Sequence, residues 1–195
     1  EADRAGAVNT LFMGVEGRLH GANTDGAGLV ADLCGNLGCS LQGRRVVVLG
    51  AGGAVRGVMQ AVLEQKPRQV ILANRTIDKA HTLAATFADC GSVMVKPFAD
   101  LDGDVDIVIN GTSASLSGSI PVIPEASVRN AELVYDMMYA ERATPFLAWA
   151  AQAGARRCAD GLGMLVEQAA EAFFIWRGVR PQSAPVLRAL RYHGM

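Results

Sequence analysis

From residue 44 onward, the hydrophobic positions alternate between short continuous apolar runs and longer runs with helical spacing. Short apolar runs that end at glycine or polar residues are typical of buried parallel strands. Such runs predict strands at residues 45–49, 69–73, 93–95, 106–110, 133–136 and 155–159. The helical spacing predicts helices at residues 54–65, 78–88, 144–153, 162–176 and 183–192. Strands that alternate with helices in this way predict an α/β fold with a doubly wound, mostly parallel sheet.

The residues before this region follow a different pattern. Residues 7–21 predict two short strands that a glycine-bounded turn joins as a hairpin. The polar segment Asn23-Thr24-Asp25-Gly26 then precedes a helical run to residue 33, and Asn23 or Thr24 is expected to cap that helix. Late in the chain, the apolar stretch 162–176 is too short to span a bilayer and contains charged residues. It predicts a helix with one buried face.

The strand expected at residues 45–49 leads directly into a glycine-rich turn that opens the next helix. A dinucleotide pyrophosphate needs a tight turn without side chains in its way, and backbone N–H groups at a helix N-terminus. The third position of the standard fingerprint is Val55, which departs from the pattern. A turn of this kind also occurs as plain structure, but strand, turn, helix and next strand follow here in the required order. The sequence therefore predicts a Rossmann-type dinucleotide site at Gly50, Gly52, Gly53 and Ala54.

The end of the second strand distinguishes the two nicotinamide cofactors. NAD-dependent proteins place an acidic residue there for the ribose hydroxyls, whereas a nearby arginine accommodates the 2′-phosphate of NADP. This sequence has Asn74, Arg75 and Thr76 at that point, with Lys79 one helical turn later. A guanidinium offers planar donors to phosphate oxygens. A solvated basic cluster is the alternative interpretation, but the position after the second strand favours NADP as the cofactor.

Composition and charge narrow the range of partners. Hydrophobic residues make up 50% of the chain and charged residues 19%, which is ordinary for a folded globular protein. The net charge of −1 provides no basic surface for nucleic acid or an anionic membrane, so neither is expected as a partner. The four cysteines form no Cys-x-x-Cys pair and have no histidine nearby at ligand spacing, so no metal site is expected. Unpaired thiols predict a cytoplasmic protein.

Eight ordered motifs resemble those of the shikimate dehydrogenases, a family of oxidoreductases. They are Ala7-Val8-Asn9-Thr10, Asn23-Thr24-Asp25-Gly26, residues 50–54, Asn74-Arg75-Thr76, residues 109–113, Tyr135-Asp136-Met137 with Tyr139, Thr144-Pro145-Phe146-Leu147, and residues 159–164 with Gln168. The resemblance extends over essentially the whole chain. It implies the reduction of 3-dehydroshikimate to shikimate with NADPH, a reversible hydride transfer in aromatic amino-acid biosynthesis.

The resemblance also implies roles for individual residues. Asp25 resembles the aspartate of the family's catalytic Lys–Asp pair, and a partner for the hydroxyl proton is what hydride transfer at a carbinol carbon requires. Substrate contacts are implied for Asn9, Asp25, Tyr139 and Gln168. Cofactor contacts are implied for Thr112, Ser113, Met137, Gly161 and Met164, the later ones near the nicotinamide. Lys79 stands where many members have arginine. From the residues alone, Asp25 would be a helix-capping residue and Gln168 a surface glutamine.

The sequence also departs from the family in its motifs. The family's Ser-x-Ser pair and its Asn-x-Thr-x-Pro motif, which leads to the catalytic lysine, are not found. The lysines are Lys66, Lys79 and Lys96, and none has the expected context. We therefore expect a fragment that binds NADP but oxidises shikimate poorly or not at all. Its parts would be a remnant of the substrate-binding domain (1–25), the NADP-binding domain (26–161) and C-terminal helices that return to the substrate domain (162–195).

Two alternatives stay open at this point. A quinate/shikimate dehydrogenase that prefers NAD would carry an acidic residue after the second strand, and Asn74 and Arg75 argue against it. A non-catalytic module that binds NADP or shikimate would not need the lysine. However, Asn9, Asp25 and Gln168 are more than a cofactor sensor requires. The expected partner is a small molecule, and the sequence does not distinguish a monomer from a homodimer.

Overall fold

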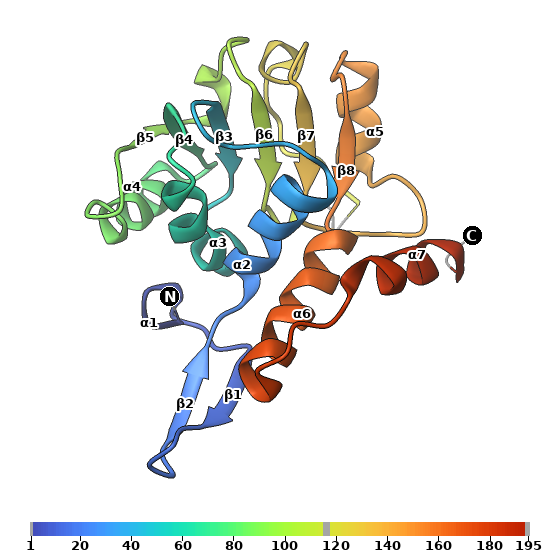
Figure 1. Ribbon diagram of the computed structural model, residues 1–195. Coiled ribbons are helices and arrows are strands. Elements are labelled where there is room, and N and C mark those ends of the chain that lie inside the picture. The colour runs from blue at the N-terminus through green and yellow to red at the C-terminus, as the bar shows by residue number, and fades with distance from the viewer. Residues whose placement is uncertain (1, 115–117, 194–195) are drawn as a thin grey trace.

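The computed structural model describes residues 2–114 and 118–193. Within them, a parallel sheet of six strands forms the centre of the molecule (Figure 1). In spatial order the strands are β5 (Val93–Lys96), β4 (Gln69–Ala73), β3 (Arg45–Leu49), β6 (Ile107–Asn110), β7 (Leu133–Asp136) and β8 (Cys158–Asp160). Every neighbouring pair is parallel. The predicted doubly wound α/β fold is therefore confirmed.

The order of the strands fixes where a ligand can bind. The chain moves outward from β3 through β4 to β5 and then returns to the other side of β3 to form β6, β7 and β8. In such sheets the strand order reverses at a switch point, and ligands bind in the crevice outside the carboxyl ends of the strands there. The switch point of this sheet lies between β3 and β6.

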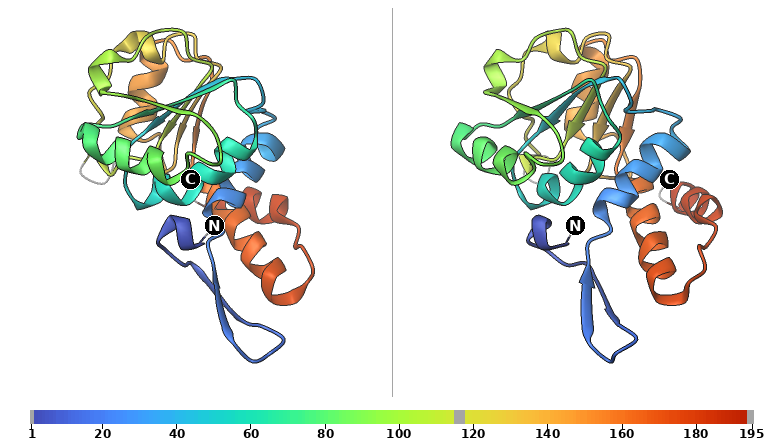
Figure 2. Two further views of the ribbon diagram at one scale, coloured as in Figure 1. Left: turned by 90° about the vertical axis from the view of Figure 1, so that its left-hand side faces the viewer. Right: turned by 60° about the vertical axis from the view of Figure 1, so that its left-hand side comes forward.

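Helices and loops cover both faces of the sheet, as the two views of Figure 2 show. Side chains of β3 alternate between the two layers, with Val46 and Val48 facing one and Val47 and Leu49 the other. The first layer contains α2 (Asp25–Val30), α3 (Gly53–Glu64) and α4 (Ile77–Thr86). The second contains α5 (Pro145–Gln152) and the segments 98–105 and 120–131, which include the 3₁₀ turns Phe98–Asp100 and Glu125–Ser127.

A hairpin and the helices from both ends of the chain lie below the sheet in Figure 1. Strands β1 (Thr10–Met13) and β2 (Leu19–Ala22) are antiparallel, and the short helix α1 (Ala2–Ala5) precedes them. Helix α6 (Leu162–Arg177) runs alongside, and the Trp176 indole donates a hydrogen bond to the carbonyl of Leu11 (2.8 Å). Helix α7 (Ser183–His193) follows it.

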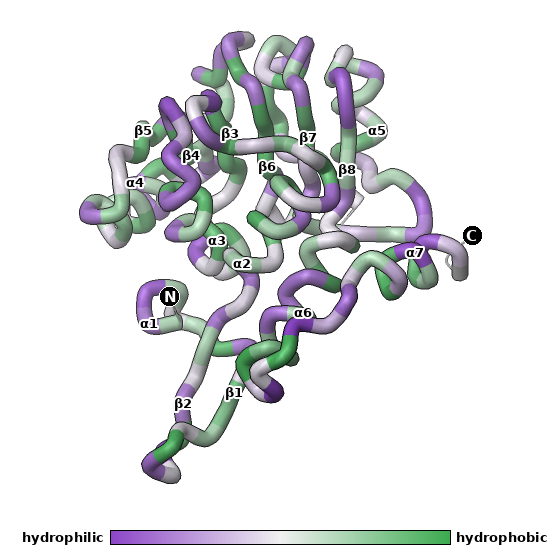
Figure 3. Tube along the Cα trace, viewed as in Figure 1, coloured by the Kyte–Doolittle hydropathy of each residue, from purple (hydrophilic) through white to green (hydrophobic). Residues whose placement is uncertain are grey.

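Apolar residues are exposed on the hairpin and the adjoining end of α6, where green stretches alternate with white and purple ones in Figure 3. The exposed fractions are 57% for Leu11, 63% for Met13, 67% for Leu19 and 55% for Trp176. Large exposed apolar surface is typical of a region that packs against other protein. No helix among the described residues is both long and apolar enough to cross a bilayer.

Two element bounds differ clearly from the sequence expectations, and the structure distinguishes the two expected capping residues. The helix that begins at Asp25 does not end at residue 33, because it continues as a π-helix over Ala31–Asn36. Thr24 occupies the cap position without a side-chain capping bond, whereas Asn23 Oδ1 accepts a hydrogen bond from the Asp25 amide (3.0 Å). The last strand begins at Cys158 rather than at residue 155, because the amide of residue 155 bonds back to Ala150 after α5.

A buried polar cluster links the π-helix to β7 and α6. Asp32 is 3% exposed, and its carboxylate accepts hydrogen bonds from the Tyr135 hydroxyl (2.7 Å) and from Asn36 Nδ2 (2.9 Å). The Asn36 amide also lies 3.1 Å from Glu167 Oε1 on α6. Burial raises the pKa of Asp32, and burial, together with the charge of Asp32, raises the pKa of Tyr135.

We expect the stability difference between the wild type and Asp32→Asn to depend on pH. A carboxyl pKa that is raised in the folded state contributes stability below the ordinary aspartate pKa of about 4, and this contribution is lost as the pH rises through the raised value. Asparagine does not ionise, so the variant should gain stability relative to the wild type from about pH 4 towards neutrality. Urea unfolding at a series of pH values measures this, and a difference that stays constant with pH would contradict it.

Candidate functional site

The turn after β3 has the shape that a dinucleotide phosphate requires. Gly50 has a φ of +104°, which favours glycine, and a Cβ at this position would lie 3.1 Å from the carbonyl oxygen of Gly111. At Gly52 and Gly53 a Cβ would meet nothing within 4 Å, so the space above the turn is open. The turn leads into the exposed N-terminus of α3, where the first backbone N–H groups lack helical partners. These features fit a bound pyrophosphate.

The residues predicted to select NADP lie at the carboxyl end of β4. Asn74 donates from Nδ2 to the carbonyl of Thr76 (2.7 Å), which fixes the turn into α4. Arg75, Thr76 and Lys79 are exposed. Across the described residues, neither Arg75 nor Lys79 has an ion-pair or hydrogen-bond partner. Two cations that no carboxylate neutralises are therefore available to a phosphate on this side of the glycine turn.

The loops after β6, β7 and β8 lie at the same carboxyl edge of the sheet. Thr112 and Ser113 follow β6, and Met137 follows β7. A Cβ on Gly161 would collide with the carbonyl of Met137, so glycine is required for the loop after β8 to lie this close to the loop after β7. The structure thus brings the predicted cofactor residues of three loops to the switch-point side of the sheet.

A cavity of about 320 Å³ adjoins these loops where α2 and α6 meet the sheet. It is lined by Asn9, Asp25, Met137, Tyr139, Gly161, Met164, Leu165 and Gln168. All of the residues with an implied substrate contact are among them, although they come from four separate parts of the chain. Leu165 was not predicted, and its only signal in the sequence is its position in the helix between Met164 and Gln168.

Hydrogen bonds arrange the polar side chains of this cavity. Asn9 donates from Nδ2 to Asp25 Oδ1 (2.9 Å), while Asn9 Oδ1 accepts from the Thr24 amide (3.0 Å). The hydroxyl of Thr24, which is 1% exposed, lies 3.1 Å from Gln168 Oε1. Gln168 Nε2 donates to the carbonyl of Leu165 (3.1 Å). Buried Thr24 therefore ties the hairpin, α2 and α6 together, and the Asp25 carboxylate remains half-buried at the cavity wall.

The three lysines lie elsewhere. Lys66 follows α3, Lys79 is on α4, and Lys96 ends β5, where its ammonium group pairs with Asp102 (2.9 Å). None of them lines the cavity that contains Asp25. In the described part of the chain there is also no group of three His, Cys, Asp or Glu side chains that could hold a metal ion.

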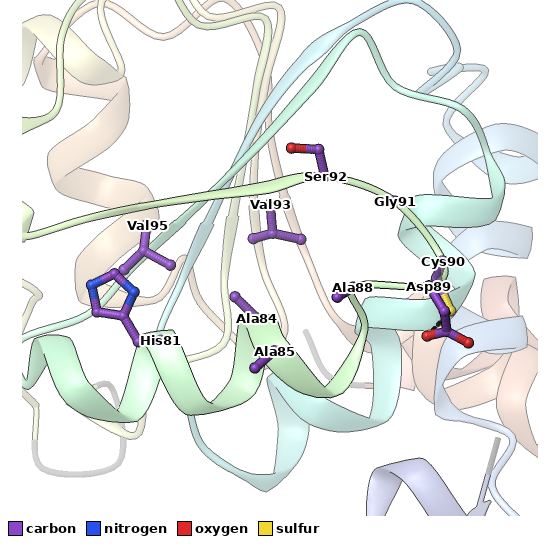
Figure 4. A pocket seen from close by; sticks show the side chains of 10 residues that line it. All are labelled: His81, Ala84, Ala85, Ala88, Asp89, Cys90, Gly91, Ser92, Val93 and Val95. Atoms are coloured by element: carbon purple, nitrogen blue, oxygen red, sulfur yellow. Dashed lines mark hydrogen bonds between the residues drawn. The ribbon is translucent and has the colours of Figure 1, made fainter.

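A larger hollow of about 640 Å³ lies between α4 and the edge strand β5. Figure 4 shows Ala84 and Ala85 of α4, and Ala88 just after it, opposite Val93 and Val95 of β5. The hollow contains none of the residues that the sequence singled out, and small aliphatic side chains form much of its wall. We therefore place the candidate site at the smaller cavity.

Comparison with known proteins agrees with this geometry. A family model described as "Shikimate / quinate 5-dehydrogenase" matches residues 32–138, and one described as "Shikimate 5'-dehydrogenase C-terminal domain" matches residues 161–191. The shikimate dehydrogenase (NADP(+)) of Hahella chejuensis is 55% identical over 190 residues. The chain belongs to the shikimate dehydrogenase family. The resemblance inferred from the motifs is thereby confirmed.

The aligned regions cover 97% of this chain and 70% of the Hahella chejuensis relative. Among solved structures, the Ael1 enzyme from Pseudomonas putida superposes with a TM-score of 0.92 at 44% identity, over 97% of this chain and 69% of that one. The shikimate 5-dehydrogenase of Thermus thermophilus, solved with NADP(H) and shikimate, has a TM-score of 0.83 at 33% identity. That match covers 100% of this chain and 70% of the Thermus chain.

Proposed function

We propose that the chain carries out the reversible, NADPH-dependent reduction of 3-dehydroshikimate to shikimate, an oxidoreductase step of aromatic amino-acid biosynthesis. The observation that carries this proposal is the cavity itself. Asn9, Asp25 and Gln168 form its polar wall, and Met137, Gly161 and Met164 connect that wall to the loops at the carboxyl edge of the sheet. A small polyhydroxylated acid held there would lie next to a dinucleotide bound along the same edge.

NADP is the cofactor that the residues fit. When bound, it supplies or accepts the hydride. The open turn at Gly50, Gly52, Gly53 and Ala54 would hold its pyrophosphate at the N-terminus of α3. Asn74, Arg75, Thr76 and Lys79 would hold its 2′-phosphate. The relatives support this choice, because the Hahella chejuensis enzyme is a shikimate dehydrogenase (NADP(+)) and the Thermus structure contains NADP(H).

The polar wall would orient the substrate and handle its proton. The Asp25 carboxylate, held by Asn9 at 2.9 Å, would exchange a proton with the hydroxyl of the reacting carbon. Asn9, Tyr139 and Gln168 would bind the other hydroxyl groups. Thr112, Ser113, Met137, Gly161 and Met164 would line the cofactor side. The lysine of the family's Lys–Asp pair is not among the residues that line this cavity, so we expect turnover by these 195 residues to be slow.

Within this proposal the chain has three parts. Residues 1–25 contribute to the substrate site, residues 26–161 form the NADP-binding domain, and residues 162–195 return towards the substrate site. The four cysteines are unpaired thiols, which suits a cytoplasmic enzyme.

Initial rates with both cofactors and both substrates test the function. We expect the purified chain to reduce NADP+ faster than NAD+ in the presence of shikimate, because Arg75 and Lys79 suit a 2′-phosphate. We also expect shikimate to be oxidised faster than quinate, as the similarity to shikimate dehydrogenases (NADP(+)) suggests. Faster reduction of NAD+ with quinate would instead favour the quinate/shikimate alternative. Binding of NADP+ without any substrate-dependent reduction would favour a non-catalytic module.

Arg75→Ala should weaken the binding of NADPH about 30-fold and leave the binding of NADH unchanged, because hydrogen bonds from a guanidinium to a charged group are among the stronger ones. Fluorescence titration with each nucleotide measures this. Arg68→Ala is the matched control, since Arg68 is an exposed arginine before the opposite, amino end of β4. Equal weakening of NADPH and NADH, or an equal effect of Arg68→Ala, would contradict the assignment of Arg75 to the 2′-phosphate.

A further inference from the structure

Two buried polar side chains end neighbouring strands at the carboxyl edge of the sheet. Asn110 is the last residue of β6 and Asp136 the last residue of β7, and they are direct partners in the parallel register. Both are 0% exposed. Burying a carboxylate costs considerable free energy unless hydrogen-bond donors surround it. The donors that surround Asp136 therefore show which parts of the molecule depend on it.

Asp136 accepts hydrogen bonds from three different segments. Asn110 Nδ2 donates to Oδ1 (3.0 Å), and the backbone amide of Met138 donates to the same oxygen (3.2 Å). The hydroxyl of Thr144, the cap residue of α5, donates to Oδ2 (2.6 Å). One carboxylate thus joins strand β6, the loop after β7 and the start of α5.

The same bonds fix residues on the cofactor side of the sheet. Asn110 Oδ1 accepts from both the amide (3.1 Å) and the hydroxyl (2.8 Å) of Thr112, so the side chain that Asp136 holds in turn holds the loop after β6. Met138, which bonds to Asp136, directly follows Met137, and the Met138 carbonyl accepts a hydrogen bond from the amide of Gly161 (3.0 Å). The loops after β6, β7 and β8 are therefore coupled through one buried group.

We propose that Asp136 is a positioning residue for the nicotinamide half of the cofactor. Its carboxylate fixes Thr112 through Asn110, and it fixes Met137 through the adjacent amide of Met138. Asp136 has no exposed surface, so it acts through these residues and contacts neither cofactor nor substrate. The inference rests on the proposed NADP site and adds to it a group that the motif comparison did not assign to any ligand.

Asp136→Asn tests the inference because asparagine keeps the size of the side chain and removes its charge. The wild type and the variant are titrated with NADPH, and separately with adenosine 2′,5′-bisphosphate, a fragment with the 2′-phosphate end and no nicotinamide. We expect the variant to bind NADPH about tenfold more weakly, the factor that corresponds to the loss of one charge-assisted hydrogen bond. The affinity for the fragment should not change, since Asn74, Arg75 and Thr76 follow β4, on the other side of β3.

A second pair of variants provides the matched control. Thr144→Val removes the hydroxyl that donates to Asp136 at nearly constant volume, whereas Thr144→Ser keeps it. We expect weaker NADPH binding from the valine variant only, again with unchanged binding of the fragment.

Three results would overturn the inference. Unchanged NADPH affinity in Asp136→Asn and Thr144→Val would show that the carboxylate does not position the loops. Weakening of NADPH and the fragment by the same factor would show a general loss of structure. If the wild type itself failed to bind NADPH, the proposed cofactor site would be wrong. That result concerns the wild type alone, so it is distinguishable from a failure of the inference about Asp136.

Discussion

We expect Asp25→Asn to lower kcat/KM for shikimate at least about 100-fold, while the affinity for NADPH stays unchanged. General acid–base groups contribute factors of about 100 to 10,000, and an amide of the same size cannot take up the hydroxyl proton. Asn9 donates to Asp25 Oδ1, and an asparagine oxygen at this position can still accept that bond. The substitution therefore removes the proton-transfer chemistry and preserves the arrangement of the cavity wall.

Initial rates of shikimate-dependent NADP+ reduction measure the effect of Asp25→Asn, and NADPH fluorescence reports the integrity of the cofactor site. Asp100→Asn serves as the control, because Asp100 is an exposed aspartate in the 3₁₀ turn after β5, far along the chain from the cavity residues. If Asp25→Asn retained most of the wild-type rate, Asp25 would be a helix-start residue and nothing more.

Gly28→Ala should lower the free energy of unfolding by about 3 kcal/mol. This is the upper end of the typical destabilisation when an extra carbon is inserted between well-packed groups. A Cβ at residue 28 would lie 2.7 Å from Gln168 Cβ, 2.8 Å from the Gln168 nitrogen and 2.8 Å from the Met164 oxygen. Two of these are backbone atoms of α6 that cannot rotate away. Helix α6 must therefore shift relative to α2, and it carries residues of the cavity wall with it.

Urea unfolding and the KM for shikimate test both consequences of Gly28→Ala. The control is Gly35→Ala, which lies in the same helical segment at a position where a Cβ would meet nothing within 4 Å. We expect this control to be neutral or stabilising by up to about 1 kcal/mol, because glycine carries an entropic cost in helices. Wild-type stability and wild-type KM in Gly28→Ala would contradict the close packing of α2 against α6.

The sequence determined the strands well where apolar runs end sharply. The bounds of β3, β4 and β7 agree with the expectation at both ends. A charged residue precedes each strand, glycine follows β3, asparagine follows β4, and the apolar run of β7 ends at Asp136. The start of β8 was misplaced, since residues 155–157 are equally compatible with the turn after α5 and with a strand. The π-helix at Ala31–Asn36 was missed because hydrophobic spacing over six residues does not distinguish it from a continued α-helix.

The candidate site was predictable to the extent that motifs encode it. The glycine turn and the residues after β4 could be placed from local pattern alone, whereas the meeting of Asn9, Asp25, Tyr139 and Gln168 in one cavity depended on the family resemblance. The buried pairs could not be found in this way. Tyr135 and Asp32 are 103 residues apart and Asn110 and Asp136 are 26 apart, so only the strand order and register bring them together.

Transfer of deuterium from shikimate to NADP+ would demonstrate hydride transfer by this chain. Shikimate labelled at the carbinol carbon that becomes the ketone is incubated with the purified chain and NADP+, and the NADPH formed is examined for the label. We expect labelled NADPH that forms slowly and only when shikimate is present, with a smaller yield from NAD+. NADP+ that binds but acquires no deuterium from shikimate would contradict the proposed hydride transfer.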